Sequence, residues 1–172
     1  MRSSRGTARR RRKRRPDVRV ERLPREPAEA DIDAVMALET DSFTNPWSRE
    51  SLVWELQNSD VTRAYLLRDD DERAVAFCLC WVLFDELHIN TLAVARAERR
   101  RGLATVLMRE TMADAVSAGA TKATLEVRES NTAAIGLYER LGFRVAARRP
   151  RYYSKPDEDG LILWKEQIDA SP

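Results

Sequence analysis

Residues 74–84, AVAFCLCWVLF, constrain the fold of this chain more than any other segment. All eleven residues are apolar, but a helix needs about 20 such residues to cross a membrane. A continuous apolar run of this length is typical of a buried strand. We therefore expect a β-sheet that buries this segment in a globular domain, and no membrane-spanning segment.

Strand-like segments on both sides of this run predict an antiparallel meander. RAYLLRD (63–69) precedes it, DDDER forms a hairpin turn, and ELHINTLAV (86–94) follows. Apolar residues recur at helical spacing in 29–43, and Ser48 can cap a short helix that runs to residue 58. Further strands are expected at 18–23, 122–128, 143–148 and 160–166, and further helices at about 102–118 and 131–141. This order predicts a mixed α/β domain with a mostly antiparallel central sheet flanked by helices.

The N-terminal segment differs from the rest of the chain in charge. Residues 1–27 hold 12 of the 30 basic and 3 of the 28 acidic residues, a net charge of +9, which leaves 18 basic and 25 acidic residues and a net charge of −7. We expect residues 1–17 to be a disordered basic arm, 18–168 the folded domain and 169–172 a short tail. The arm could contact RNA or remain a solvated tail. No apolar segment follows the arginines, so no secretory signal is expected and a cytoplasmic location is favoured.

The cysteines and the single histidine fit structural roles. Cys78 and Cys80 lie two residues apart, so on a strand they share one face. No second pair of ligands accompanies them, so we expect two small core side chains and no metal site. His88 alternates with Leu87 and Ile89, which favours a half-buried structural histidine. It could alternatively shape a substrate pocket.

A candidate anion site lies at the start of the helix expected near residue 102. The first turn of a helix carries backbone N–H groups without partners, at the positive end of the helix dipole. Gly102 allows a ligand to approach the backbone closely, and Arg99, Arg100 and Arg101 add positive charge. The pattern suits a pyrophosphate, although a charged turn before an amphipathic helix explains it equally well. A nicotinamide-binding loop is disfavoured because Gly-x-Gly-x-x-Gly is missing.

A longer pattern resembles a known enzyme family. The segments ELHINTLAV, RRRGLATVLM and ATLEVRESNTAAIGLYERLGF, between residues 86 and 143, resemble the GNAT acyltransferases. Within that family the chain is most similar to the enzymes that acetylate the N-terminal alanine of a ribosomal protein. The resemblance implies that acetyl-CoA is the acetyl donor, bound where the fourth and fifth strands splay apart. By resemblance, the cofactor is held by the backbone of Leu92, Ala93 and Val94, by a pyrophosphate loop of Arg100, Arg101, Gly102, Leu103, Ala104 and Thr105, and by Asn131.

Two side chains are the candidate catalytic residues. Glu126 should face away from Leu125 and Val127, where it could pair with a cation such as Arg128 or act as a base. The resemblance assigns it removal of a proton from the substrate amine. Tyr138 could be a core residue, and the resemblance makes it the acid that protonates the departing CoA thiolate. A phenol, with an ordinary pKa near 10, keeps its proton at neutral pH. The resemblance implies direct attack by the amine, with no acyl-enzyme.

The acceptor is the least constrained part of this prediction. The expected loop RYYSKPDEDG departs from the related pattern at Ser154 and Gly160, and it should help to shape the acceptor site. We expect transfer to the N-terminal alanine of a ribosomal protein. Acetylation of a small amine or a lysine side chain is the first alternative. An RNA- or ribosome-binding module with a vestigial site is the second, and the presence of both Glu126 and Tyr138 argues against it.

Overall fold

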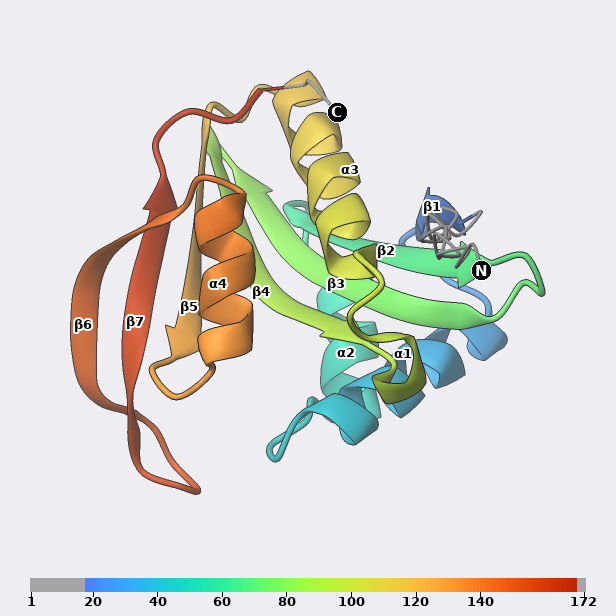
Figure 1. Ribbon diagram of the computed structural model, residues 1–172. Coiled ribbons are helices and arrows are strands. Elements are labelled where there is room, and N and C mark those ends of the chain that lie inside the picture. Colours follow the sequence, from blue (N-terminus) through green and yellow to red (C-terminus); the bar gives the residue numbers. More distant parts are fainter. Residues whose placement is uncertain (1–17, 170–172) are drawn as a thin grey trace, which may run out of the picture.

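The computed structural model describes residues 18–169. The expected basic arm and the last residues of the tail lie outside this range. The elements are β1 (Val18–Arg22), α1 (Glu29–Ser42), α2 (Arg49–Asn58), β2 (Thr62–Asp69), β3 (Ala74–Leu83), β4 (Glu86–Val94), the 3₁₀ turn η1 (Arg96–Glu98), α3 (Leu103–Ser117), β5 (Lys122–Arg128), α4 (Thr132–Arg140), β6 (Arg144–Tyr153) and β7 (Glu158–Lys165). Their order confirms the predicted mixed α/β class (Figure 1).

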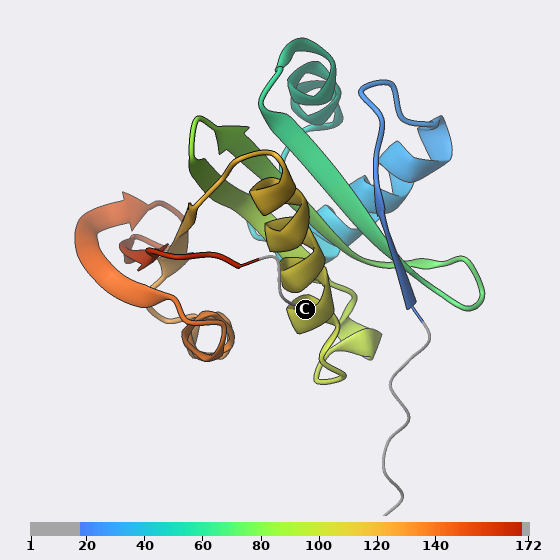
Figure 2. The same ribbon diagram turned by 90° about the horizontal axis from the view of Figure 1, so that it is seen from above.

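The seven strands form one sheet in the order β1-β2-β3-β4-β5-β7-β6. Every neighbouring pair is antiparallel except β4 and β5, which run parallel. Figure 2 shows α3 and α4 on one side of the sheet and α1 and α2 on the other. The sheet is therefore covered on both faces, which explains why β3 is an almost continuous apolar run. No helix within residues 18–169 is long and apolar enough to cross a membrane.

Each pair of helices closes its own hydrophobic core. Leu107, Met108 and Met112 of α3 pack with Leu125 of β5 and with Tyr138 of α4. On the other face, apolar residues of α1 and α2 pack against β2 and β3. Both cysteines are buried free thiols in the first core, as the spacing predicted. The sheet is thus held from both sides by helices that bury their apolar stripes.

The sheet opens between β4 and β5. These strands pair only from Glu86 to Ile89 of β4, opposite Lys122 to Leu125 of β5. Directly beyond Ile89 the register between β3 and β4 shifts, and Asn90 is left without a partner in β3. Such a β-bulge bends its strand. The two strands then diverge, as Figure 1 shows, and this splay agrees with the geometry that the resemblance implies.

The last hairpin is longer than the sequence predicted. The final strands were expected at 143–148 and 160–166, with RYYSKPDEDG as a loop. In the structure β6 continues to Tyr153 and β7 begins at Glu158, so most of that loop is strand. β6 is the outer edge of the sheet, and all of its residues except Tyr153 are exposed.

Candidate active site

The start of α3 forms a backbone anion site. Gly102 is the N-cap residue, with a left-handed φ of 83°, and no side chain caps this helix end. No residue among 18–169 accepts a hydrogen bond from the backbone N–H groups of Gly102, Leu103 or Ala104. A Cβ built on Gly102 would meet no atom within 4 Å, so the space above the backbone is open. The residues present therefore fit a pyrophosphate, whose charge the helix dipole would stabilise.

Thr105 contributes less to this cradle than the resemblance implies. Its backbone N–H donates to the carbonyl oxygen of Gly102 over 3.0 Å. Only the hydroxyl group of Thr105 is therefore left to donate to a ligand.

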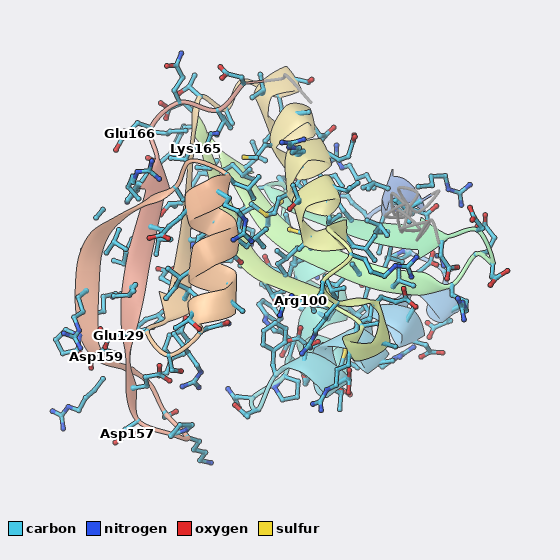
Figure 3. The ribbon with its side chains drawn as sticks, in the orientation of Figure 1. Arg100, Glu129, Asp157, Asp159, Lys165 and Glu166 are labelled. Atoms are coloured by element: carbon cyan, nitrogen blue, oxygen red, sulfur yellow. The ribbon has the colours of Figure 1, made fainter. Side chains whose placement is uncertain are left out.

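The three consecutive arginines have separate roles. Arg99 turns back and donates from Nε to the carbonyl oxygen of Val94 over 3.0 Å. Arg101 is paired with Glu98. Arg100, with a φ of 65°, makes no ion pair with a described residue and lies on the loop before α3, beside the opening of the sheet in Figure 3. Arg100 is thus the arginine of this group most available to an anion.

The edge of β4 beyond the bulge is the second part of the site. Leu92 and Ala93 pair with Cys78 and Phe77 of β3 on one side. On their other side the pairing with β5 has already ended. Val94 occupies the same edge, although its carbonyl oxygen accepts from Arg99. A strand edge of this kind offers backbone donors and acceptors to an extended ligand.

Glu126 lies on β5 just past the last residue pair with β4. Its neighbours Leu125 and Val127 are buried in the core, so Glu126 faces the opposite side, as predicted. Its carboxylate contacts His88 (Nε2–Oε2 3.0 Å) and Arg149 (Nη1–Oε1 3.5 Å). The hydrogen bond from His88 lowers the pKa of Glu126, and Arg149 lowers it further against the opposing effect of burial.

The cation suggested by sequence spacing has a different partner. Arg128 pairs with Glu158 at 3.2 Å and lies over the ring of Tyr153 at 4.4 Å. Arg149, from β6, instead reaches Glu126 and stacks over Tyr152 at 4.5 Å. Sequence reasoning missed Arg149 because only the pairing of β6 with β7 brings it to this place.

His88 is fixed from two sides. An ionised carboxylate has no hydrogen to donate, so Nε2 of His88 donates to Glu126. The other side of the imidazole lies against Trp81, with ring centroids 5.6 Å apart. Trp81 in turn donates from Nε1 to Glu55 of α2 over 2.7 Å. The sequence left the role of His88 open, and the contacts place it beside the candidate base.

Tyr138 lies on α4 and is buried. Its ring packs edge-on against Phe143, with centroids 5.9 Å apart. The hydroxyl group makes no hydrogen bond with any residue among 18–169. Burial raises the pKa of Tyr138, so the phenol holds its proton at neutral pH. The position fits both a core tyrosine and a proton donor.

Asn131 has a structural role that the sequence analysis did not include. It is the N-cap residue of α4, and its side-chain oxygen accepts from the backbone N–H of Ala134 over 3.2 Å. Its amide nitrogen remains for a ligand. The pattern of Asn followed by a helical run could have indicated this cap.

No group of three or more His, Cys, Asp or Glu residues that could hold a metal ion occurs within residues 18–169. The candidate site consists of a backbone anion cradle, an open strand edge, a carboxylate with a histidine, and a buried phenol.

Comparison with known proteins agrees with this geometry. The family model described as "Acetyltransferase (GNAT) family" matches residues 32–143. A Salmonella typhimurium protein named [ribosomal protein bS18]-alanine N-acetyltransferase is 33% identical over 135 residues, covering 77% of this chain and 89% of that protein.

Solved structures of other proteins are also similar to this fold. The Escherichia coli ribosomal-protein-S18-alanine N-acetyltransferase superposes with a TM-score of 0.77 at 28% identity, covering 90% of this chain and 96% of that one. Arabidopsis thaliana NAA60 in complex with acetyl-CoA gives a TM-score of 0.74 at 17% identity, over 86% of this chain and 97% of that one. The second likeness concerns the fold alone.

Proposed function

The chain belongs to the acetyltransferase (GNAT) family, and from that premise we propose that it transfers the acetyl group of acetyl-CoA to the α-amine of an N-terminal alanine on a ribosomal protein. One observation carries the proposal: the opening between β4 and β5 has an anion cradle near one end and Glu126 with His88 near the other. An extended phosphorylated thioester fits that order of groups.

In this proposal the donor lies along β4. The backbone N–H groups at Gly102, Leu103 and Ala104, with Arg100 and Arg101, hold the pyrophosphate. The edge of Leu92, Ala93 and Val94 pairs with the pantetheine arm, and the amide of Asn131 and the hydroxyl of Thr105 contact the rest. When bound, acetyl-CoA supplies an activated acetyl group. The protein supplies position and proton transfer.

Glu126 takes the proton from the acceptor amine. The free amine has a pKa near 7.7–8.0, and only its neutral form is a nucleophile. As the N–C bond forms, the amine proton becomes much more acidic, so a carboxylate of lowered pKa is a sufficient base. His88 holds the carboxylate in place while a water molecule can relay the proton.

Tyr138 donates the balancing proton. When the C–S bond breaks, the sulfur leaves with the electron pair and takes the phenolic proton. The raised pKa of Tyr138 ensures that the proton is present at neutral pH. One proton is thus removed at nitrogen and one is supplied at sulfur, and the cysteines take no part in the reaction.

The acceptor assignment rests on the relatives and on charge. Residues 28–172 carry a net charge of −7, which favours a basic acceptor such as a ribosomal protein. Charge close to the site is mixed, because Arg148 pairs with Glu129 and Asp159, two of the acidic residues labelled in Figure 3. A ribosomal acceptor would place the reaction in the cytoplasm. We also propose that the arm 1–17, outside the described residues, contacts RNA.

Competition among acceptors tests the proposed function. The enzyme with acetyl-CoA is given peptides that begin with Ala, Ser or Met, a Lys peptide with a blocked N-terminus, and spermidine. We expect the alanine peptide to have the highest kcat/KM, measured by mass spectrometry of the products. A higher kcat/KM for spermidine would favour the small-amine alternative, and a higher value for the blocked peptide would favour lysine acetylation. Deletion of residues 1–16 serves as a control and should leave peptide acetylation nearly intact.

A further inference from the structure

Asn90 lies at the point where the sheet opens. It is the first residue of β4 beyond the pairing with β5, which ends at Ile89 opposite Leu125. It is also the bulged residue, because Leu79 of β3 pairs with Thr91 and Cys80 pairs with Ile89. Asn90 is therefore not held by a cross-strand partner in β3, and it borders the angle between the diverging strands.

The side-chain amide nitrogen of the half-buried Asn90 has no partner. Its Nδ2 atom is inaccessible to solvent and donates to no atom of residues 18–169. Both polar neighbours on β4 have partners: His88 contacts Glu126, and Thr91 donates to Glu39 over 3.3 Å. A buried donor without an acceptor typically costs about 1–3 kcal/mol. Native proteins leave few such groups, and a functional role is one reason for them.

The position of Asn90 along β4 indicates which atom could satisfy it. In the proposed function the pyrophosphate lies at Gly102 and the pantetheine arm at Leu92–Val94. From Leu92 back along β4 toward Ile89, where the pairing with β5 ends, the next part of an extended donor is its thioester. Asn90 and Glu126 each come one residue after the last pair between β4 and β5. Asn90 therefore lies near the acetyl end of the proposed donor and not near its phosphate end.

We propose that the side-chain amide of Asn90 donates a hydrogen bond to the carbonyl oxygen of the bound acetyl thioester. This inference rests on the proposed function. The carbonyl oxygen gains negative charge while the N–C bond forms and loses it when the C–S bond breaks. A donor beside this oxygen stabilises that charge. No proton is transferred by Asn90.

The substitution Asn90→Leu tests the assignment in two independent ways. In the protein without ligand, it removes an unpartnered amide at similar volume, so the melting temperature should rise or stay equal. Binding of acetyl-CoA should weaken by about threefold to tenfold, the equivalent of one neutral hydrogen bond. Binding of CoA, which lacks the acetyl group and its carbonyl oxygen, should not change. Calorimetric titration with both ligands measures the difference, and kcat should fall by about tenfold or more.

Thr111→Val is the matched control. Thr111, in α3, also carries a solvent-inaccessible polar side-chain atom without a partner among the described residues. It is buried in the middle of the helix, nine residues after Gly102. Its replacement by valine should raise the melting temperature in the same way and leave the affinities for acetyl-CoA and CoA unchanged.

Three results would overturn the proposal. A lower melting temperature in Asn90→Leu would mean that the amide has a partner in the free protein. Equal weakening of acetyl-CoA and CoA would place the contact on the pantetheine arm or indicate a distorted site. Unchanged acetyl-CoA affinity and unchanged kcat would remove any role. The titrations need no acceptor, so they still test Asn90 if the wild-type protein acetylates none of the peptides and the proposed function fails.

Discussion

Gly102→Ala should separate the role of the backbone cradle in folding from its role in binding. Gly102 has a left-handed φ of 83°, which costs a residue with a side chain about 1–2 kcal/mol. The new Cβ meets no atom within 4 Å, so backbone strain is the only cost to the free protein. In a chain of this size each kcal/mol lowers the melting temperature by roughly 2–4 °C. We therefore expect a folded variant that melts roughly 2–8 °C below the wild type.

Gly119→Ala is a control with the same backbone strain. Gly119 follows the last turn of α3, has a φ of 99°, and also has no atom within 4 Å of a built Cβ. It lies at the opposite end of the helix from the cradle. Both variants should lose similar stability, but only Gly102→Ala places a methyl group in the space that the pyrophosphate is proposed to occupy.

A thermal-shift titration with acetyl-CoA gives the result. At a ligand concentration of 100 times the wild-type Kd, binding stabilises the wild type by about 2.7 kcal/mol. If Gly102→Ala weakens binding about tenfold, the same concentration stabilises it by only about 1.4 kcal/mol. Gly119→Ala should show the full wild-type increase. If acetyl-CoA stabilised the two variants equally, the assignment of the cradle to the pyrophosphate would be refuted.

Two further predictions concern protonation. Glu126→Gln and Tyr138→Phe should each lower kcat by about 10²-fold or more and leave the Kd of acetyl-CoA nearly unchanged. The loss of kcat in Glu126→Gln should become smaller as the pH rises through the pKa of the acceptor amine. A wild-type kcat in either variant would mean that the substituted residue has a structural role. Burial raises the pKa of Glu39 above its ordinary value of about 4.5. Above that pH the native state therefore binds more protons than the unfolded state. The free energy of unfolding should then fall as the pH rises toward the native pKa. Glu39→Gln should remove that fall in a pH series of urea unfolding, and an unchanged slope would contradict it.

The order of elements could be predicted because most of them carry their own periodicity. The apolar run of β3, the alternation of β4 and β5 and the cap at Ser48 are local signals, and the structure confirms them. The extension of β6 and β7 was missed because Ser154, Pro156 and Gly160 are turn formers. Ser154 and Pro156 do lie in the turn, but pairing with Arg149 places Gly160 inside β7.

The contacts of the site were less predictable than its residues. Glu126 was recognised, but spacing suggested Arg128 as its cation, and the contacts come from β4 and β6. The three arginines before α3 were expected to act together, yet Arg99 and Arg101 are engaged by Val94 and Glu98. A single sequence gives the charge of a segment but not the long-range pairing that directs each side chain.

The exposed outer strand β6 has a consequence for self-association. An open sheet edge is a template on which another chain can add a strand, and from there fibrous aggregates can grow. An incoming strand would have to pair with a segment that holds four arginines, Arg144, Arg148, Arg149 and Arg151. It would also meet Pro150, which has no N–H to donate, inside an interval where pairing with β7 is irregular. The protein can therefore leave this edge uncovered and still resist polymerisation.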